Sequence, residues 1–357
     1  MSNQVKNIKL VSFIIPAYNA ADTIVRCLDS IYALSLKRDE FEVIVIDDAS
    51  SDSTILVTED YRERLRMNNL IILRQQENHR QGAARNRGVK IANGDYICFV
   101  DADDAVTKSI LNAILLAKET DSDIVALHYG YANERGELTS EAERLSFAPK
   151  QVFSGIEMQN KHPYWCSAPW GYIYKKNWGA EVNYPFVEDA LFEDSDFVVV
   201  HLYYAKRMLY SSELGYCAYY REGSTSRSTT YRSIADYLLL GTRMLTFFRR
   251  ITDKNENELM SDGEIKFAEG ILEGACWNIE KSCKRIIKLE DVNEVIKYYK
   301  RIDAHVNRGD LYSDWRIRKY YWNAWTSICI GHKKIAIYLL AILMPIYKVL
   351  RGVRSKV

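Results

Sequence analysis

Residues 94–104 read GDYICFVDADD, and this stretch decides the fold class. The apolar run Tyr96–Val100 leads directly into three aspartates within four residues, Asp101, Asp103 and Asp104. A short apolar run bounded by polar residues indicates a strand buried on both faces, as in a parallel sheet. Ligands of such sheets bind beyond the carboxyl ends of the strands. The stretch therefore predicts a buried strand that delivers carboxylates to a ligand site.

The same alternation continues on both sides of this stretch. Strands are predicted at Leu10–Ile15 (ended by Pro16), Phe41–Ile46, Leu70–Leu73 and Asp123–Leu127. Helices are predicted from Asp22 or Thr23 through Leu34, and at Thr54–Leu65, Ala83–Ala92 and about 110–115. Strands that alternate with helices are typical of a doubly wound, mostly parallel sheet. Asp47 and Asp48 follow the second strand, so they are expected at the same edge as Asp101.

Composition limits the classes of partner. The chain has 357 residues, with 48 basic and 47 acidic side chains, so its net charge of +1 gives no signature of a nucleic-acid-binding protein. Its seven cysteines form no CxxC pair, and the six histidines show no zinc-ligand spacing. Free thiols and a start without an apolar signal core predict a cytoplasmic location.

The three aspartates themselves have two readings. Asp101 and Asp103 suit a Mg²⁺ or Mn²⁺ ion that also binds phosphate oxygens, because hard divalent ions favour carboxylate, water and phosphate ligands. Alternatively, the turn caps the next helix, with Asp104 near the N-terminus of that helix. An Asp-x-Asp turn by itself leaves both readings open.

Neighbouring motifs favour the metal. In order along the chain stand FIIPAYN (13–19), VIVIDDASSDS (43–53), Asn78, Gly82, ARN (84–86), Gly88 and the opening stretch. This ordered set resembles the family 2 glycosyltransferases of GT-A fold. The resemblance is dense from Val11 to Asp104 and continues in pieces to about residue 230.

The resemblance implies a nucleotide-sugar site. Pro16, Ala17 and Tyr18 match the loop around the donor base, and Asp47 and Asp48 match carboxylates that accept hydrogen bonds from the base or ribose. Arg85 matches a basic residue of the nucleotide pocket. The plainer readings are that Asp48 caps its loop and that Arg85 is a solvated helix residue.

The resemblance also implies the catalytic groups. Asp101 would approach the ribose and the metal, and Asp103 would be the main protein ligand to Mn²⁺ or Mg²⁺. Phe192–Phe197 resembles the family's Glu-Asp motif, so Asp194 is the expected base that deprotonates the acceptor hydroxyl in an inverting displacement. The dipeptide Glu188-Asp189 offers the same pair five residues earlier.

Two further segments match the family in the acceptor half. WGYIYK (170–175) supplies aromatic faces for sugar rings, or else buried core. YREGSTS (220–226) resembles a loop that closes over the diphosphate, with Arg221 as its phosphate contact, although it also reads as a simple turn.

The C-terminal tail suggests contact with a membrane. Ile335–Tyr347 has no charged residue, and lysines and arginines lie on both sides of it. Thirteen residues are fewer than the roughly 20 that a spanning helix needs, so an interfacial helix with a basic flank fits better than a membrane span. Packing against the protein's own core is the alternative.

The sequence thus predicts an inverting, metal-dependent transferase with three parts. Residues 1–125 would bind the nucleotide-sugar, residues 126–230 would bind the acceptor and carry the base, and residues 231–357 would form a helical appendage that ends in the membrane-contacting tail. The expected donor is a UDP-sugar carrying a hexosyl or N-acetylhexosaminyl group, and the expected acceptor is a glycan or lipid-linked hydroxyl in polysaccharide synthesis at the inner face of the cell membrane. The alternatives are an inactive scaffold of the same fold and a sugar nucleotidyltransferase. The turn at 16–19 lacks the glycines that a nucleotidyltransferase or dinucleotide-binding enzyme needs.

Overall fold

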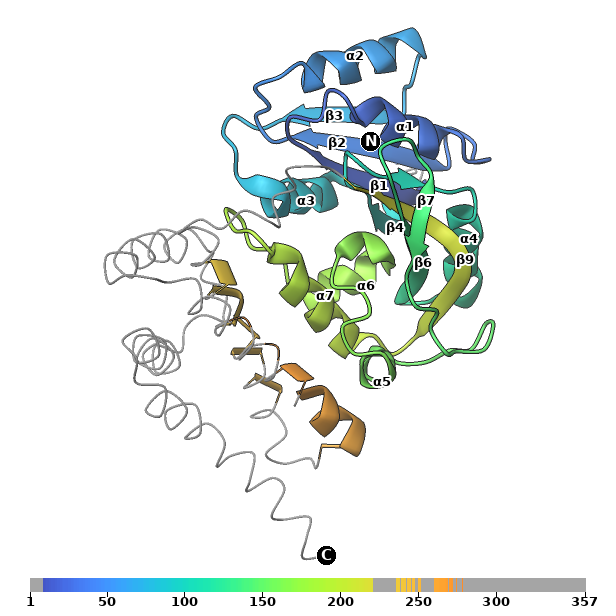
Figure 1. Ribbon diagram of the computed structural model, residues 1–357, viewed down its shortest axis with the longest axis vertical. Coiled ribbons are helices and arrows are strands. Elements are labelled where there is room, and N and C mark those ends of the chain that lie inside the picture. Colours follow the sequence, from blue (N-terminus) through green and yellow to red (C-terminus); the bar gives the residue numbers. More distant parts are fainter. Residues whose placement is uncertain are drawn as a thin grey trace, which may run out of the picture. The chain divides into compact units, whose positions relative to one another are not determined.

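The computed structural model describes residues 9–220 without a break, together with scattered residues between 236 and 278 (Figure 1). The chain divides into two compact units, Met1–Ser224 and Thr225–Val357. Most described residues of the second unit are helical. Arg221 and the tail Ile335–Tyr347 lie outside the described residues. Among the helices that are described, none is long and apolar enough to cross a membrane.

Four parallel strands form the first half of the sheet, as the sequence predicts. They are ordered β3-β2-β1-β4, with bounds Lys9–Ala17 for β1, Phe41–Asp47 for β2, Leu70–Arg74 for β3 and Gly94–Phe99 for β4. Helices α1 (Ile24–Tyr32), α2 (Thr54–Arg64) and α3 (Arg80–Ile91) connect them. Every residue of β2 is buried, which confirms that this apolar strand is covered on both faces.

Strand β1 runs through Pro16, where the sequence predicted that it would end. The carbonyl of Ile14 accepts a hydrogen bond from the N–H of Val100 (3.0 Å), so the backbone polar groups of Ile14 point toward the β4 side. These groups alternate sides along a strand, so those of Pro16, two positions later, point toward the same side. Strand β4 has ended by then, at Phe99, and the missing N–H of Pro16 removes no bond between the two strands. The strand therefore extends two residues beyond the predicted end at Ile15, to Ala17.

The second half of the sheet is mixed. Here β6 (Ile124–Ala132) does not pair with β4, because β8 (Tyr172–Lys175) lies antiparallel between them. Strand β9 (Met208–Tyr219) runs parallel to β6, and the short β5 (Ala105–Val106) and β7 (Leu138–Glu141) pair with β9 and β6. Figure 1 shows β6 and β9 side by side. The helical elements here are α4 (Ile110–Thr120), α5 (Gly155–Lys161), η1 (Pro169–Gly171), α6 (Lys176–Val182) and α7 (Glu193–Tyr204).

Candidate active site

The carboxyl ends of β1, β2 and β4 meet at one edge of the sheet, where the strand order reverses. The chain passes from β1 to β2 and β3 on one side, then crosses to β4 on the other side of β1. Loops that leave such a switch point in opposite directions form the ligand crevice of doubly wound sheets. Ala17, Asp47 and Asp101 stand at or directly after these strand ends, so the predicted donor residues lie at one edge.

The loop after β1 is fixed to the loop after β2. Asn19 adopts a left-handed conformation (φ 50°), and its backbone N–H donates to the Ser50 hydroxyl at 2.9 Å. Its side-chain oxygen accepts from the N–H of Ser51 at 2.9 Å. Ala17 is buried, whereas Tyr18 is 49% exposed. The loop therefore presents an aromatic ring at the end of β1.

The two carboxylates after β2 have different surroundings. Asp47 is fully buried, and Arg74 lies 3.4 Å from its Oδ2, while Oδ1 has no hydrogen-bond partner among the described residues. Asp48 instead accepts bonds from the side chain of Gln75 and the backbone N–H of His79. Burial raises the pKa of Asp48, and these bonds oppose that rise. Asp48 thus organises its loop, as the plainer reading expected, and Asp47 Oδ1 is a buried acceptor without a partner among the described residues.

Asp104 fastens the aspartate turn to β9 instead of capping a helix. Helix α4 begins only at Ile110, with Ser109 at its N-cap. The Asp104 carboxylate accepts bonds from the Tyr216 hydroxyl and the Tyr219 N–H, both at 2.7 Å. The helix-capping reading of Asp104 is therefore wrong, because the next helix starts too far along the chain.

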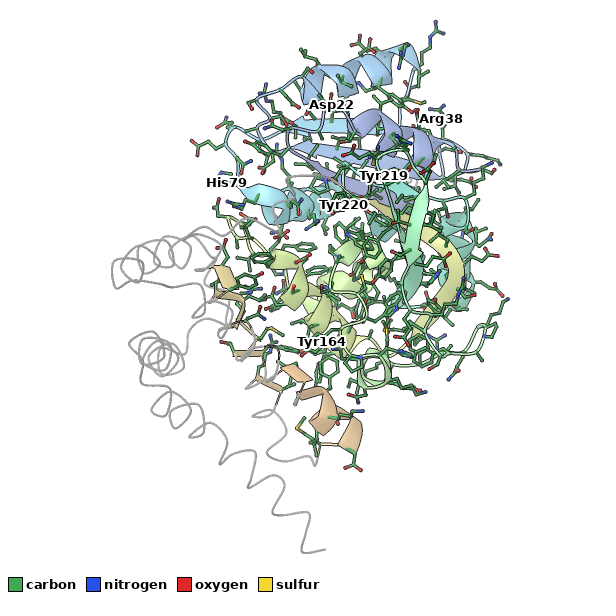
Figure 2. The ribbon with its side chains drawn as sticks, in the orientation of Figure 1. Asp22, Arg38, His79, Tyr164, Tyr219 and Tyr220 are labelled. Carbon is green, nitrogen blue, oxygen red and sulfur yellow. The ribbon has the colours of Figure 1, made fainter. Side chains whose placement is uncertain are left out.

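Arg26 of α1 holds the same turn from its other side. Its guanidinium donates to the backbone carbonyl of Asp103 and lies 3.8 Å from the ring centre of Tyr219. This ring, labelled in Figure 2, ends β9. Asp103 is partly exposed, and its carbonyl oxygen accepts the bond from Arg26. The turn is thus clamped between α1 and β9.

Arg85 joins the two halves of the site. It is 1% exposed, and its guanidinium donates to Asp101 Oδ1 at 2.9 Å and to Glu193 Oε1 at 2.7 Å. Burial alone would lower the pKa of Arg85, but the two carboxylates outweigh burial and raise it. Burial raises the pKa of Glu193, and the guanidinium opposes that rise. Arg85 is therefore neither solvated nor open, but a buried cation between carboxylates 92 residues apart in the sequence.

Asp194 lies next to this cation, in the first turn of α7. Its side chain is only partly exposed. Burial raises the pKa of Asp194 to about 6; Arg85 lowers it and Asp101 raises it. A carboxylate with a pKa near neutrality is suited to accept a proton and release it again. The Asp194 side chain thus has the electrostatic character expected of a general base.

The alternative pair, Glu188-Asp189, holds a loop against α3. Asp189 Oδ1 lies 3.1 Å from His79 Nδ1, and Glu188 accepts a bond from the Asn86 side chain at 3.1 Å. His79, labelled in Figure 2, lies directly before α3. Asn86 also bonds both the N–H and the carbonyl of Phe186. Through these contacts Glu188 and Asp189 hold the loop around residues 186–189 against α3.

Gly82 makes this docking possible. A Cβ atom at this position would lie 2.1 Å from the carbonyl oxygen of Val187 and 3.0 Å from Glu193 Cγ. We expect Gly82→Ala to lower the free energy of unfolding by about 1–3 kcal/mol, because the docked loop must move. Gly179→Ala is the matched control, since its Cβ would meet nothing within 4 Å and alanine favours the helix. Urea unfolding of both variants tests this, and equal stability changes would contradict it.

The residues of the aspartate turn fit a divalent metal that is shared with a phosphate. Asp101 Oδ2 makes no hydrogen bond within the described part of the chain, and Asp103 is partly exposed beside it in the turn. No group of three or more His, Cys, Asp or Glu side chains is arranged to hold an ion among the described residues. Two carboxylates suit Mg²⁺ or Mn²⁺ only when phosphate and water supply the other ligands.

Sequence reasoning missed Arg26 and Tyr216. Both contact the aspartate turn, but they lie more than 70 residues before and more than 110 residues after it. No local pattern marks such pairs, because their proximity depends on the position of α1 and on the pairing of β9. The only sequence signal for Tyr216 was its place in an apolar run, which predicts burial but no partner.

Comparisons with known proteins identify a family and several relatives. Residues 12–175 match the family described as glycosyl transferase family 2. The poly(ribitol-phosphate) beta-glucosyltransferase of Bacillus spizizenii is 36% identical over 127 residues, which cover 35% of this chain and 20% of that protein. The uncharacterized glycosyltransferase EpsJ of Bacillus subtilis is 32% identical over 231 residues, covering 61% of this chain and 63% of that protein. The chain thus spans less than two thirds of these relatives.

A solved structure shares the fold. The crystal structure of S. aureus TarS residues 1–349 in complex with UDP-GlcNAc has a TM-score of 0.63 and 23% identity. The likeness covers 91% of this chain and 90% of that one. The mixed α/β sheet is therefore of the GT-A type, as the sequence predicted.

Proposed function

Because the chain belongs to glycosyltransferase family 2 through residues 12–175, we propose that it is an inverting, metal-dependent glycosyltransferase that uses a UDP-sugar. The observation that carries the proposal is the buried cation Arg85, whose guanidinium bonds Asp101 of the donor half and Glu193 of the acceptor half. That contact sets the proposed metal-binding turn and the proposed base Asp194 at one site.

Asp194 acts as the general base in this proposal. Its carboxylate takes the proton of the acceptor hydroxyl while the hydroxyl oxygen attacks the anomeric carbon. The bond from that carbon to the diphosphate oxygen breaks, the diphosphate leaves with the bonding electrons, and the anomeric centre inverts. A Mn²⁺ or Mg²⁺ ion held by Asp103 and Asp101 would neutralise charge on the leaving diphosphate.

The donor base is proposed to bind at the ends of β1 and β2. Tyr18 is half exposed, and Asp47 Oδ1, which is buried without a partner among the described residues, would accept a bond from a uracil N–H that enters beside it. TarS, which shares the fold, was crystallised with UDP-GlcNAc, and this supports a hexosyl or N-acetylhexosaminyl donor. The name of the Bacillus spizizenii relative, poly(ribitol-phosphate) beta-glucosyltransferase, supports a polymer hydroxyl as the acceptor, and the acceptor proposed for this chain is a glycan or lipid-linked hydroxyl in cell-surface polysaccharide synthesis.

The tail Ile335–Tyr347 and its basic flanks are proposed to bind the inner face of the cell membrane. The full chain is expected to float with vesicles that contain anionic lipid, and less so at high salt. A chain that ends at residue 331 is expected to remain in the bottom fraction, without the vesicles. Equal flotation of both chains would contradict this proposal.

A panel of UDP-sugars tests the activity itself. The full chain with Mn²⁺ is expected to release UDP from one of them faster when a glycan acceptor is present. An inactive scaffold of the same fold would bind UDP and release none from any donor. A nucleotidyltransferase would instead release pyrophosphate from UTP and a sugar phosphate.

The proposed base predicts the pH dependence of transfer. The pKa of Asp194 is raised to about 6, mainly by burial, and Arg85, Asp101, Asp196 and Glu193 are the charged groups around it. Below this pKa the carboxylate is protonated and cannot accept a proton, so kcat/KM for the acceptor should fall about tenfold per pH unit. UDP binding measured at each pH is the control. A flat profile between pH 5 and pH 7 would contradict Asp194 as base.

A further inference from the structure

Tyr216 is a fully buried residue of β9 whose hydroxyl bonds both ends of the aspartate turn, residues 101–104. The hydroxyl oxygen accepts a bond from the Asp101 N–H at 3.1 Å, and the hydroxyl donates to Asp104 Oδ2 at 2.7 Å. The Asp104 N–H in turn donates to the Asp101 carbonyl at 3.0 Å. One hydroxyl thus closes a ring of hydrogen bonds around the turn that carries the proposed metal ligands.

Asp101 is held at two of its atoms. Its N–H is bonded to Tyr216, and its Oδ1 accepts a bond from the Arg85 guanidinium at 2.9 Å. The Asp101 side chain is 19% exposed, and its Oδ2 makes no hydrogen bond within the described part of the chain. Because the main chain and one carboxylate oxygen are both fixed, the direction of the other oxygen is fixed as well. Oδ2 is therefore the Asp101 oxygen left for a metal ion.

The Tyr216 ring has little freedom to move its hydroxyl. It stacks on Trp170 with ring centres 4.5 Å apart and planes within 5°. Strand β5, which directly follows the aspartate turn, pairs with β9 at this residue, with Val106 opposite Tyr216. Strand β6 pairs with β9 on the other side, with Tyr129 opposite Tyr216. A side chain that is already ordered loses little conformational entropy when it holds another group in place.

The hydroxyl of Tyr216 needs an explanation of its own, since a phenylalanine would provide the same ring stack. A buried hydroxyl costs free energy unless it is hydrogen-bonded. Both of the bonds described for this hydroxyl go to the aspartate turn. Contacts of this kind orient the side chains that ligate a metal, and their loss typically lowers metal affinity about 10–100-fold.

From this geometry we infer that Tyr216 is a positioning residue, whose hydroxyl fixes the Asp101 main chain so that the carboxylate meets the metal in one orientation. The inference rests on the proposed metal-dependent transferase function and adds a residue that acts through Asp101. A hydroxyl with a structural role alone would change the stability of the fold but would not change the effect of the metal on donor binding.

Calorimetric titration of UDP into the full chain, with and without Mn²⁺, tests this in Tyr216→Phe. The substitution keeps the ring and removes only the hydroxyl. Without Mn²⁺, UDP should bind the variant within twofold of the wild type. The gain in UDP affinity that Mn²⁺ provides should fall at least fivefold, and the Mn²⁺ concentration for half-maximal sugar transfer should rise at least fivefold.

Tyr96→Phe is the matched control. The Tyr96 hydroxyl is also buried, in β4, but it donates to the carbonyl of Ala117 at 2.7 Å and not to the aspartate turn. This variant should keep the full gain from Mn²⁺. Asp104→Asn is a second test of the same bonds, because its amide keeps an oxygen for the Tyr219 N–H but offers the Tyr216 hydroxyl an NH₂ group in place of an acceptor. It should lose the gain from Mn²⁺ as Tyr216→Phe does.

The inference is overturned if Tyr216→Phe keeps the gain of the wild type, or if Tyr96→Phe loses as much of it as Tyr216→Phe. The proposed function fails in a different way. A wild type that does not bind UDP, or that binds it equally well with and without Mn²⁺, contradicts the metal-dependent transferase itself.

Discussion

Asp194→Asn is expected to lower the rate of sugar transfer about 10³-fold while UDP binding stays within twofold of the wild type. The amide has nearly the shape of the carboxylate but cannot accept the proton of the acceptor hydroxyl. Because the two side chains have nearly equal volume, the substitution should create no cavity at this partly buried position beside Arg85. Steady-state transfer and calorimetric UDP binding, measured on the same preparation, separate chemistry from donor affinity.

Asp189→Asn is the control for this prediction. Asp189 belongs to the alternative acidic pair and lies 3.1 Å from His79, so its loss should weaken loop docking and leave chemistry largely intact. The assignment of the base would be reversed if Asp189→Asn abolished transfer and Asp194→Asn did not. A scaffold protein would show no transfer in the wild type and no difference between the variants.

Arg85→Met is expected to lower the free energy of unfolding by about 3–5 kcal/mol. The substitution leaves Asp101 and Glu193 next to each other without the cation that both contact, and Glu193 is 6% exposed. Repulsion between the carboxylates should also displace the aspartate turn, so UDP binding should weaken in the variant. Urea unfolding followed by circular dichroism measures the first effect.

Two further variants make this prediction specific. Arg87→Met changes a neighbouring arginine of α3 whose one hydrogen bond within the described part of the chain goes to the carbonyl of Arg74 at an exposed site, and it should cost less than about 0.5 kcal/mol. The double variant Arg85→Met/Glu193→Met removes a buried charge together with its partner and should recover part of the loss. If Arg85→Met and Arg87→Met cost the same, Arg85 does not hold the two carboxylates together.

The first half of the fold could be predicted because its signals are local. An apolar run such as Phe41–Ile46 is sufficient to predict a strand covered on both faces, and helical spacing from Ile24 to Leu34 is sufficient to predict α1. The insertion of β8 between β4 and β6 could not be predicted, since Tyr172–Lys175 carries no sign of which strands it pairs with. Pairing across many residues is decided by tertiary packing.

The same limit applies to the site. The order of motifs along the chain predicted that Asp101, Asp103 and Asp194 belong to one active site. Their roles in that site remain predictions. The neighbours of Arg85 were not predictable, because Glu193 is 108 residues away in the sequence. Resemblance indicated a nucleotide contact for Arg85, whereas the structure surrounds it with carboxylates. Spacing predicts which residues share an element, but not which elements meet.

The most direct test of the transferase function is a calorimetric titration of UDP into the wild type and into Asp103→Ala, with and without Mn²⁺. We predict that UDP binds the wild type at least tenfold more tightly when Mn²⁺ is present, and that Asp103→Ala removes this difference. Asp103 is suited to the test because it is partly exposed in the aspartate turn and is the proposed main ligand of the metal. If the wild type fails to bind UDP in either condition, and GDP, CDP and TDP fail as well, the proposed function is contradicted.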